Sequence, residues 1–163
     1  MRCRAEVARG ATFPHPPAKR PVLEQLPEHC RLVALTARGD ERGSLIPLEP
    51  GADLPFEIKR VYYIYGTVAE AERGFHAHRD LDQLAICVAG ACTMIVDDGR
   101  TRSEVRLDTP DKALLIRGLV WREMRDFSPD AVLLVLASRH YDETDYIRRY
   151  EDFLAAVAEG GKG

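Results

Sequence analysis

Short runs of β-branched and aromatic residues, separated by turn residues, follow one another along most of the chain. The clearest run covers residues 56–65 (FEIKRVYYIY), and Asp97-Asp98-Gly99 separates two later runs. Such residues prefer the pleated surface of a strand, and Asp-Gly is typical of a hairpin turn. Turn signals about every 8–12 residues are typical of an all-β sandwich or barrel. We therefore expect strands at residues 31–36, 44–48, 56–65, 75–79, 83–88, 91–96, 102–107, 113–116 and 132–137.

The C-terminal segment has a helical pattern instead. Its apolar residues recur at helical spacing with charged residues between them: Ile147, Tyr150, Phe153, Leu154 and Val157. This pattern is typical of an amphipathic helix. Acidic residues at 142, 143 and 145 suit the positive end of a helix dipole, and a Gly-Gly pair at 160–161 suits its end. We expect one C-terminal amphipathic helix.

The first residues of the chain differ in composition from the rest. Five prolines lie within residues 1–28, which show neither a helical nor an alternating apolar pattern. We therefore expect a flexible leader at residues 1–28 and a single domain at residues 29–163. A length of 163 residues fits one domain of about 100–200 residues.

Charge and hydropathy exclude several classes of partner. The formal net charge is −3, which excludes a strongly basic surface for binding a nucleic acid polymer. The longest apolar run is residues 131–137, whereas a membrane-spanning helix needs about 20 residues. No apolar stretch typical of a signal peptide follows the basic residues at the start. We expect a cytoplasmic protein without a membrane partner.

The four cysteines form no CxxC pair, which argues against a zinc or thioredoxin-type site. We expect free thiols in a reducing compartment. Cys87 and Cys92 lie five positions apart in an apolar stretch, so we expect them on opposite faces of a strand.

His76 and His78 are the most informative pair of residues. On a strand, positions i and i+2 share a face, so both imidazoles point one way and Phe75 and Ala77 the other. Two imidazoles on one face suit either metal binding or acid–base chemistry. Taken alone, the pair is equally typical of two half-buried histidines satisfied by their neighbours.

The surrounding spacing resembles the cupin superfamily. Its first motif is HxH, four residues, Glu, six residues, Gly; here His76-Ala-His78 is followed at those spacings by Gln83 and Gly90. The last histidine ligand of the second cupin motif corresponds to Arg122. Because Gln is a weak ligand and a guanidinium cannot coordinate a metal, we expect a metal-free site that works without a cofactor.

A closer resemblance, from about Arg31 to Leu154, is to the nucleotide-sugar 3,4-ketoisomerases, which are small cupins. The matching segments are residues 40–45, 55–65, 73–78, 121–124, 126–128, 132–138 and 141–148. One departure is Arg117-Gly118, where the family usually has two prolines. The resemblance implies a double-stranded β-helix, or jelly-roll barrel, with a C-terminal helix. It also implies conversion of dTDP-4-keto-6-deoxyglucose to a 3-keto isomer through an enediolate, for deoxyamino-sugar biosynthesis.

The resemblance also implies catalytic roles. His76 would be the base that removes the C3 proton, and His78 would relay protons or fix the sugar. Tyr62 would donate a hydroxyl, or else be an ordinary core aromatic. Arg122 would bind the oxyanion, and an arginine there favours the gluco product over the galacto product.

Further residues are candidates for binding the substrate. Guanidinium groups pair with phosphate in a fork, so we expect the pyrophosphate partners among Arg42, Arg60, Arg73 and Arg79, with Gln83 also contacting substrate. Arg42 and Arg73 rank highest, because both flank glycine in the matching segments. Because residues 56–65 are apolar enough to need cover on both faces, we expect a homodimer.

Three alternatives remain open from the sequence. A nucleotide-sugar 3,5-epimerase would also use a histidine base without a metal. A non-catalytic sugar-binding cupin would bind substrate without moving its protons. A metal-dependent cupin oxygenase is disfavoured by Gln83 and Arg122.

Overall fold

The computed structural model describes residues 25–51, 54–68 and 70–160, so most of the predicted leader lies outside the described part. The strands are β1 (Cys30–Ala34), β2 (Arg38–Asp40), β3 (Gly43–Leu45), β4 (Arg60–Tyr65), β5 (Arg73–His78), β6 (Gln83–Ala89), β7 (Cys92–Asp97), β8 (Arg102–Leu107), β9 (Lys112–Ile116), β10 (Trp121–Arg125), β11 (Val132–Ala137) and β12 (Tyr146–Ile147). A 3-10 turn, η1 (Glu143–Asp145), precedes β12, and one helix, α1 (Tyr150–Gly160), follows it.

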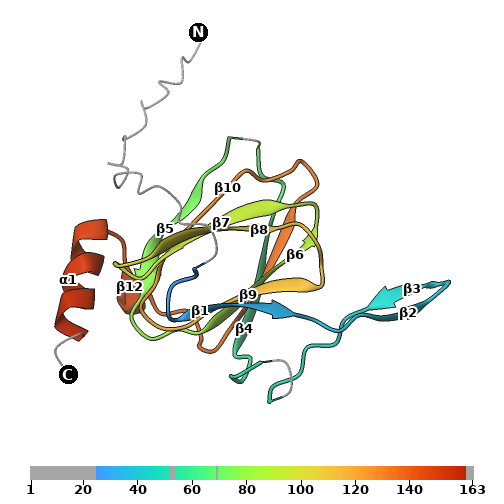
Figure 1. The fold of residues 1–163 in the computed structure, drawn as a ribbon, viewed down its shortest axis with the longest axis horizontal. Helices are drawn as coiled ribbons and strands as arrows, with labels where there is room; N and C mark the ends of the chain where they lie inside the picture. The colour runs from blue at the N-terminus through green and yellow to red at the C-terminus, as the bar shows by residue number, and fades with distance from the viewer. Residues whose placement is uncertain (1–24, 52–53, 69, 161–163) are drawn as a thin grey trace, which may run out of the picture.

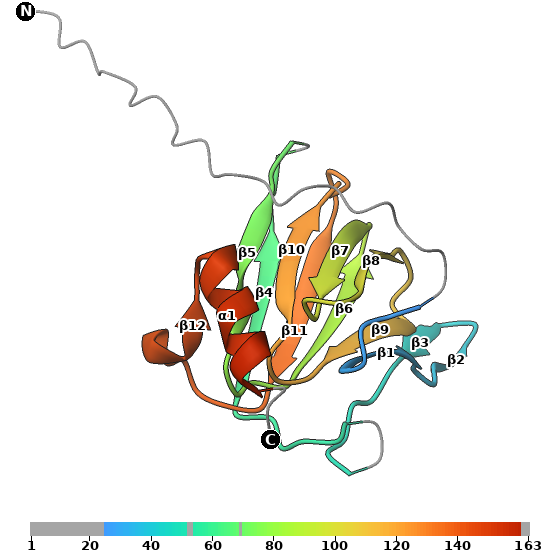
Figure 2. The same ribbon diagram turned by 60° about the vertical axis from the view of Figure 1, so that its left-hand side comes forward.

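Two five-stranded antiparallel sheets form the body of the molecule (Figures 1 and 2). One has the order β1-β9-β6-β11-β4 and the other β12-β5-β10-β7-β8, so neighbours in a sheet are mostly distant in sequence. This non-sequential order is typical of a jelly roll. The predicted all-β barrel with a C-terminal helix is therefore confirmed.

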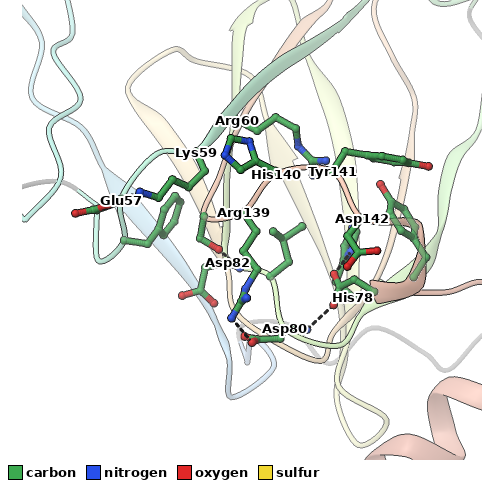
Figure 3. A pocket seen from close by; sticks show the side chains of 15 residues that line it. Glu57, Lys59, Arg60, His78, Asp80, Asp82, Arg139, His140, Tyr141 and Asp142 are labelled. Atoms are coloured by element: carbon green, nitrogen blue, oxygen red, sulfur yellow. Dashed lines mark hydrogen bonds and ion pairs between the residues drawn. The ribbon is translucent and has the colours of Figure 1, made fainter.

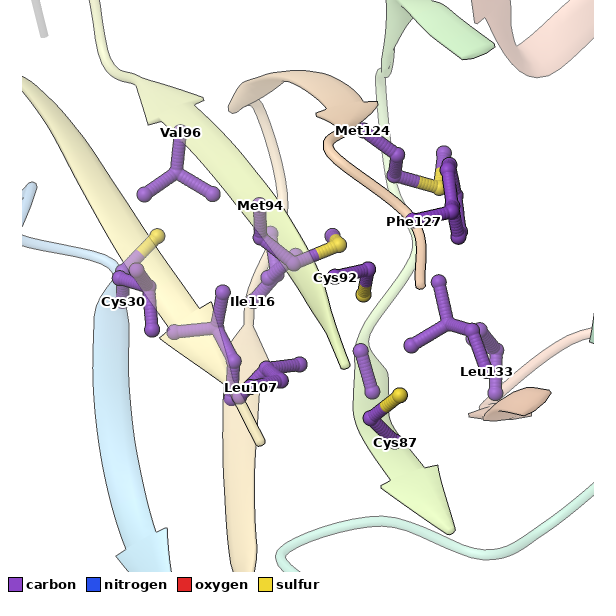
Figure 4. Close-up of a cluster of buried hydrophobic side chains, with 14 of the residues drawn as sticks. Cys30, Cys87, Cys92, Met94, Val96, Leu107, Ile116, Met124, Phe127 and Leu133 are labelled. Atoms are coloured by element: carbon purple, nitrogen blue, oxygen red, sulfur yellow. The ribbon is translucent and has the colours of Figure 1, made fainter. Parts of the chain in front are cut away.

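The space between the sheets is filled by apolar side chains over most of its length (Figure 4). Alternate residues of the strands point inward, as the two-residue period of a strand requires. Fully buried examples are Met94 on β7, Leu114 on β9 and Leu133 on β11. Burial of these side chains stabilises the barrel and closes one end of its interior.

Part of the outer face of each sheet is also covered. The loop between β3 and β4 packs Leu54 and Phe56 against Leu84 and Leu115 of the first sheet. Helix α1 packs against the second sheet, where Phe153 is fully buried (Figure 2). The apolar face that the sequence predicts for the helix therefore packs against the second sheet.

A buried polar network joins α1 to β10 and β7. The Trp121 indole and the Arg102 guanidinium both donate to Glu123, at 2.8 and 2.7 Å. The Tyr150 hydroxyl donates to Asp97 at 2.7 Å. Because buried charges need partners, these bonds fix the start of the helix against the sheet.

Two predictions about local structure were incomplete or wrong. Strand β10 was not expected from the sequence. Cys87 and Cys92 do not lie on one strand: Gly90, with φ of 61°, makes the turn between β6 and β7. Both thiols are fully buried inside the barrel and lie within hydrogen-bonding contact, not on opposite faces.

Other features lie outside the barrel. Residues 25–28, the end of the predicted leader, contact it, since Ser103 donates to the Gln25 carbonyl at 2.6 Å. Strands β2 and β3 form an exposed hairpin that projects from the body (Figure 1). Among the described residues, no helix is long and apolar enough to cross a membrane.

Candidate active site

Polar side chains converge inside the barrel at the end opposite its apolar core. They come from four strands: Tyr62 from β4, His76 and His78 from β5, Gln83 from β6 and Arg122 from β10. The imidazole centroids of the two histidines lie 4.9 Å apart. The structure therefore brings together all the predicted catalytic side chains, from segments 60 positions apart in the chain.

A bulge in β5 sets the position of His76. Gly74 and Phe75 have φ of 90° and 52°, and the register with β10 shifts beside them. A side chain at position 74 would place its Cβ 2.7 Å from the Arg122 carbonyl oxygen, so this position requires glycine. The bulge leaves His76 paired in register with Arg122.

The bulge also fixes the tautomer of His76. Its Nδ1 lies 3.0 Å from the Gly74 carbonyl oxygen, which can only accept a hydrogen bond. Nδ1 therefore carries the proton in the neutral ring, and the lone pair of Nε2 is free. Burial, together with the positive charge of Arg122, lowers the pKa of His76 to about 4. At neutral pH the ring is neutral and can accept a proton.

His78 is held in the same tautomer by a different partner. Its Nδ1 lies 2.7 Å from Oδ2 of Asp145, and Oδ1 of that carboxylate accepts from the Asp80 amide at 2.8 Å. The Nε2 of His78 is thus also free. Burial and the charge of Arg122 lower the pKa of His78 to about 2, so this ring is neutral as well.

Arg122 is a buried cation with a fixed orientation. Only 2% of its surface is exposed. Its guanidinium donates to the Val120 carbonyl at 2.7 Å and to Oε1 of Gln83. Burial lowers its pKa to about 10, so it remains charged at neutral pH. A cation held in this way can stabilise negative charge that develops on a substrate oxygen.

Gln83 links Arg122 to Tyr62. Its amide oxygen accepts from Arg122, and its Nε2 donates to the Tyr62 hydroxyl at 2.9 Å. Tyr62 is half-buried and points inward, whereas the neighbouring Tyr63 is exposed. Gln83 therefore orients two side chains of the site; a direct contact with substrate remains a prediction.

The donor set does not suit a metal ion. Arg122 places a cation beside the histidines where a cupin would supply another imidazole. Within the part of the chain that the structure describes, no three His, Cys, Asp or Glu side chains are arranged to hold a metal. The geometry fits acid–base chemistry by the protein's own groups.

A pocket of about 890 Å³ opens beside the histidines (Figure 3). His78 lies at one side of it and Glu57 with Lys59 at the other. Arg60 also lines it, with its guanidinium carbon 5.5 Å from the centroid of the Tyr62 ring. The Nε of Arg60 is buried and has no hydrogen-bond partner within the described ranges.

The other predicted arginines lie elsewhere in this chain. Arg42 is at the tip of the β2–β3 hairpin, where it pairs with Asp40. Arg73 is exposed at the start of β5, whereas His78 is at its end. Five residues of extended strand, at roughly 3.3 Å each, separate their Cα atoms by up to about 16 Å. Arg79 is exposed and does not line the pocket. Of the arginines predicted to bind pyrophosphate, the structure brings only Arg60 to the pocket.

Sequence reasoning missed two side chains of the site. Asp145 holds His78, and the Tyr146 ring lies 4.2 Å from His78 and 5.0 Å from His76 between centroids. Both belong to residues 141–148, a segment noted for its resemblance but interpreted as the start of a helix. The signal that could have found them was the match of residues 141–148 to the ketoisomerase family.

Comparison with known proteins gives the family. The chain matches the family described as "FdtA: WxcM-like, C-terminal" over residues 28–158. It is 51% identical over 120 residues to the TDP-4-oxo-6-deoxy-alpha-D-glucose-3,4-oxoisomerase of Aneurinibacillus thermoaerophilus, covering 74% of this chain and 86% of that protein. The chain belongs to this family of sugar 3,4-ketoisomerases. The resemblance found in the sequence is confirmed.

Solved structures of ketoisomerases have the same fold. A histidine-to-asparagine mutant of the 3,4-ketoisomerase QdtA from Thermoanaerobacterium thermosaccharolyticum, in complex with TDP-4-keto-6-deoxyglucose, is 38% identical with a TM-score of 0.81, covering 85% of this chain and all of that one. The WlaRB TDP-quinovose 3,4-ketoisomerase of Campylobacter jejuni is 48% identical with a TM-score of 0.76, covering 78% of this chain and 98% of that one. The cupin barrel is therefore shared across the family.

Proposed function

We propose that this protein converts dTDP-4-keto-6-deoxyglucose to a dTDP-3-keto-6-deoxyhexose. The observation that carries the proposal is the pair of neutral imidazoles, each with a free Nε2, beside the buried Arg122 cation. The names of the related proteins, which act on or bind the TDP-linked 4-keto sugar, support the choice of substrate.

The geometry supplies what the reaction needs. The C4 ketone makes the proton on C3 acidic, and a base with a free lone pair must remove it. His76 takes that proton through Nε2, and the electron pair moves to give an enediolate. Arg122 stabilises the charge on O4, and the fixed guanidinium needs no reorganisation to do so. Return of a proton to C4 then leaves the ketone at C3.

The nucleotide extends from the sugar into the pocket that Arg60 lines. The place of Arg60 in the pocket lining supports pairing with the pyrophosphate, because guanidinium groups bind phosphate in a fork. Arg73 and Arg79 remain weaker candidates, since both are exposed outside the pocket.

We assign the gluco configuration to the product and a role in deoxyamino-sugar biosynthesis. Arg122 at the site and 48% identity to a TDP-quinovose ketoisomerase support the gluco assignment, since quinovose has the gluco configuration.

The buried free cysteines at 30, 87 and 92 fit a reducing compartment, which supports a cytoplasmic location.

The same reasoning favours a homodimer. Val61 and Tyr63 on the outer face of β4 are exposed, as is Leu45 on the projecting hairpin. Apolar groups of this size need cover, and two-fold dimers are the commonest oligomers. In such a dimer, Arg42 at the hairpin tip would approach a partner rather than its own pocket. Light scattering should give twice the mass of the 18.3 kDa chain; a monomer at micromolar concentration would contradict the assignment.

Proton NMR in D₂O tests the proposed reaction. The protein incubated with dTDP-4-keto-6-deoxyglucose should yield the 3-keto isomer, and His76→Asn should lose roughly 10²–10⁴-fold in turnover while still binding dTDP. Deuterium at both C3 and C5 with the ketone still at C4 would instead indicate a 3,5-epimerase. Tight binding without any proton exchange would indicate a sugar-binding protein.

A further inference from the structure

The proposed reaction, on which this inference rests, moves two protons. One passes from C3 to C4 between carbon atoms. The other passes from the hydroxyl on C3 to the oxygen on C4, because the ketone and the alcohol exchange places. The free Nε2 atoms of the histidines suit the carbon proton. The oxygen proton needs a hydroxyl that can donate and accept at nearly the same point.

The phenol ring of Tyr146 lies beside both histidines. Strand β12 pairs with the end of β5, so that Tyr146 stands opposite His78 in the register. Its ring contacts both imidazoles and forms part of the pocket wall. The Arg148 guanidinium lies 4.5 Å from the ring centroid and is itself held by Glu143. The ring therefore has a fixed place beside the reacting end of the pocket.

The hydroxyl of Tyr146 is also free, unlike those of its neighbours. Tyr62 accepts from Gln83, Tyr141 donates to Glu143, and Tyr150 donates to Asp97. Within residues 25–51, 54–68 and 70–160, the Tyr146 hydroxyl makes no hydrogen bond. A half-buried phenol in a polar pocket with no protein partner is available to bind a ligand oxygen.

Tyr146 also acts electrostatically on two other polar groups of the site. Burial raises the pKa of Tyr62, and Tyr146 adds to that rise. Tyr146 also acts on Arg122, the cation that faces the developing oxyanion. The ring itself lies beside the two histidines, to which the proposed reaction assigns the carbon proton.

We propose that Tyr146 is a further catalytic residue, which carries the proton from O3 to O4. After His76 has taken the C3 proton, the enediolate bears its charge on O4. The phenol donates its proton to O4 and accepts the proton of the O3 hydroxyl, so the charge moves to O3 and the phenol is restored. The O3 electron pair then forms the new C3 carbonyl, and the C3–C4 double bond takes a proton at C4.

Tyr146→Phe separates this step from the first one. The variant should isomerise the substrate roughly 10²–10⁴-fold more slowly. Exchange of the C3 proton with D₂O, which needs only His76 and Arg122, should continue at close to the parent rate. The kinetic isotope effect of a C3-deuterated substrate on turnover should also disappear, because cleavage of the bond between C3 and its hydrogen no longer limits the rate.

Tyr65→Phe is the matched control, since it removes an exposed hydroxyl on the outer face of β4 and should leave both rates unchanged. The proposal is wrong if exchange and isomerisation fall together in Tyr146→Phe, or if turnover does not change. Failure of the proposed function would look different, because the parent protein would then produce no 3-keto isomer at all.

Discussion

Replacing Asp145 by asparagine tests whether the tautomer of His78 matters to the reaction. The carboxylate accepts from His78 through Oδ2 and from the Asp80 amide through Oδ1. An asparagine has only one side-chain oxygen. If that oxygen keeps the hydrogen bond from the Asp80 amide, the NH₂ group of the asparagine faces Nδ1 of His78. Because an NH₂ group only donates, Nδ1 must then accept, and the proton of the neutral ring moves to Nε2. The lone pair of His78 then points away from the pocket.

The expected magnitude follows from the bond that is lost. Hydrogen bonds to charged groups contribute about 1.5–3 kcal/mol, and each ~1.36 kcal/mol in a barrier changes the rate tenfold. Asp145→Asn should therefore reduce kcat by roughly 10- to 150-fold. The affinity for dTDP should change little, because the proposed nucleotide partner Arg60 makes no contact with Asp145 that this substitution removes.

Steady-state turnover and dTDP affinity are the measurements. Glu151→Gln is the control, since it removes an exposed carboxylate of α1 that does not line the pocket. Parent-like kcat in Asp145→Asn would refute the reasoning, because the site would then work with either tautomer of His78. An equal loss in both variants would point to a general effect on the C-terminal segment.

Three further predictions concern the same groups. The acid limb of kcat/KM should lie near pH 4, since the neutral form of His76 is the base and its pKa is about 4; half-loss near pH ~6.5 would contradict this assignment. Gln83→Leu should lower the free energy of unfolding by about 1–3 kcal/mol, measured in urea, because the buried Arg122 loses an acceptor; an unchanged midpoint would argue against that bond. Exhaustive chelation should leave turnover intact, and a loss restored by one metal ion would show that the site needs a metal.

The fold could be predicted where one face of a strand is apolar. Strand β8 shows this pattern, strands β6 and β11 are apolar almost throughout, and α1 has apolar residues at helical spacing. Strand β10 shows none of these patterns, because Arg122 points into the barrel and Glu123 points under the helix, so charges lie on both faces. The break between the runs at residues 83–88 and 91–96 was predicted, but the continuous apolar character around it led Cys87 and Cys92 to be assigned to one strand.

Local pattern alone predicted the site only where its residues are close in sequence, whereas Tyr62, Gln83 and Arg122 were predicted from the family resemblance. The HxH spacing on one strand indicated His76 and His78 directly. Asp145 lies 67 positions from His78 in the chain, and no local sequence pattern predicts their hydrogen bond. Its acidic neighbours suit a helix start, yet residues 143–145 form a 3-10 turn that aims the carboxylate at the barrel.

The order of synthesis has a consequence for when the enzyme becomes active. The strands from β1 to β11, with both histidines and Arg122, are complete once Ala137 has left the ribosome. Asp145, Tyr146 and the helix that anchors them follow afterwards. A chain that ended at Ala137 would contain the proposed base and oxyanion partner but not Asp145, which orients His78, or Tyr146, which lines the pocket. Products of premature termination after β11 would keep the barrel strands but lack a finished site.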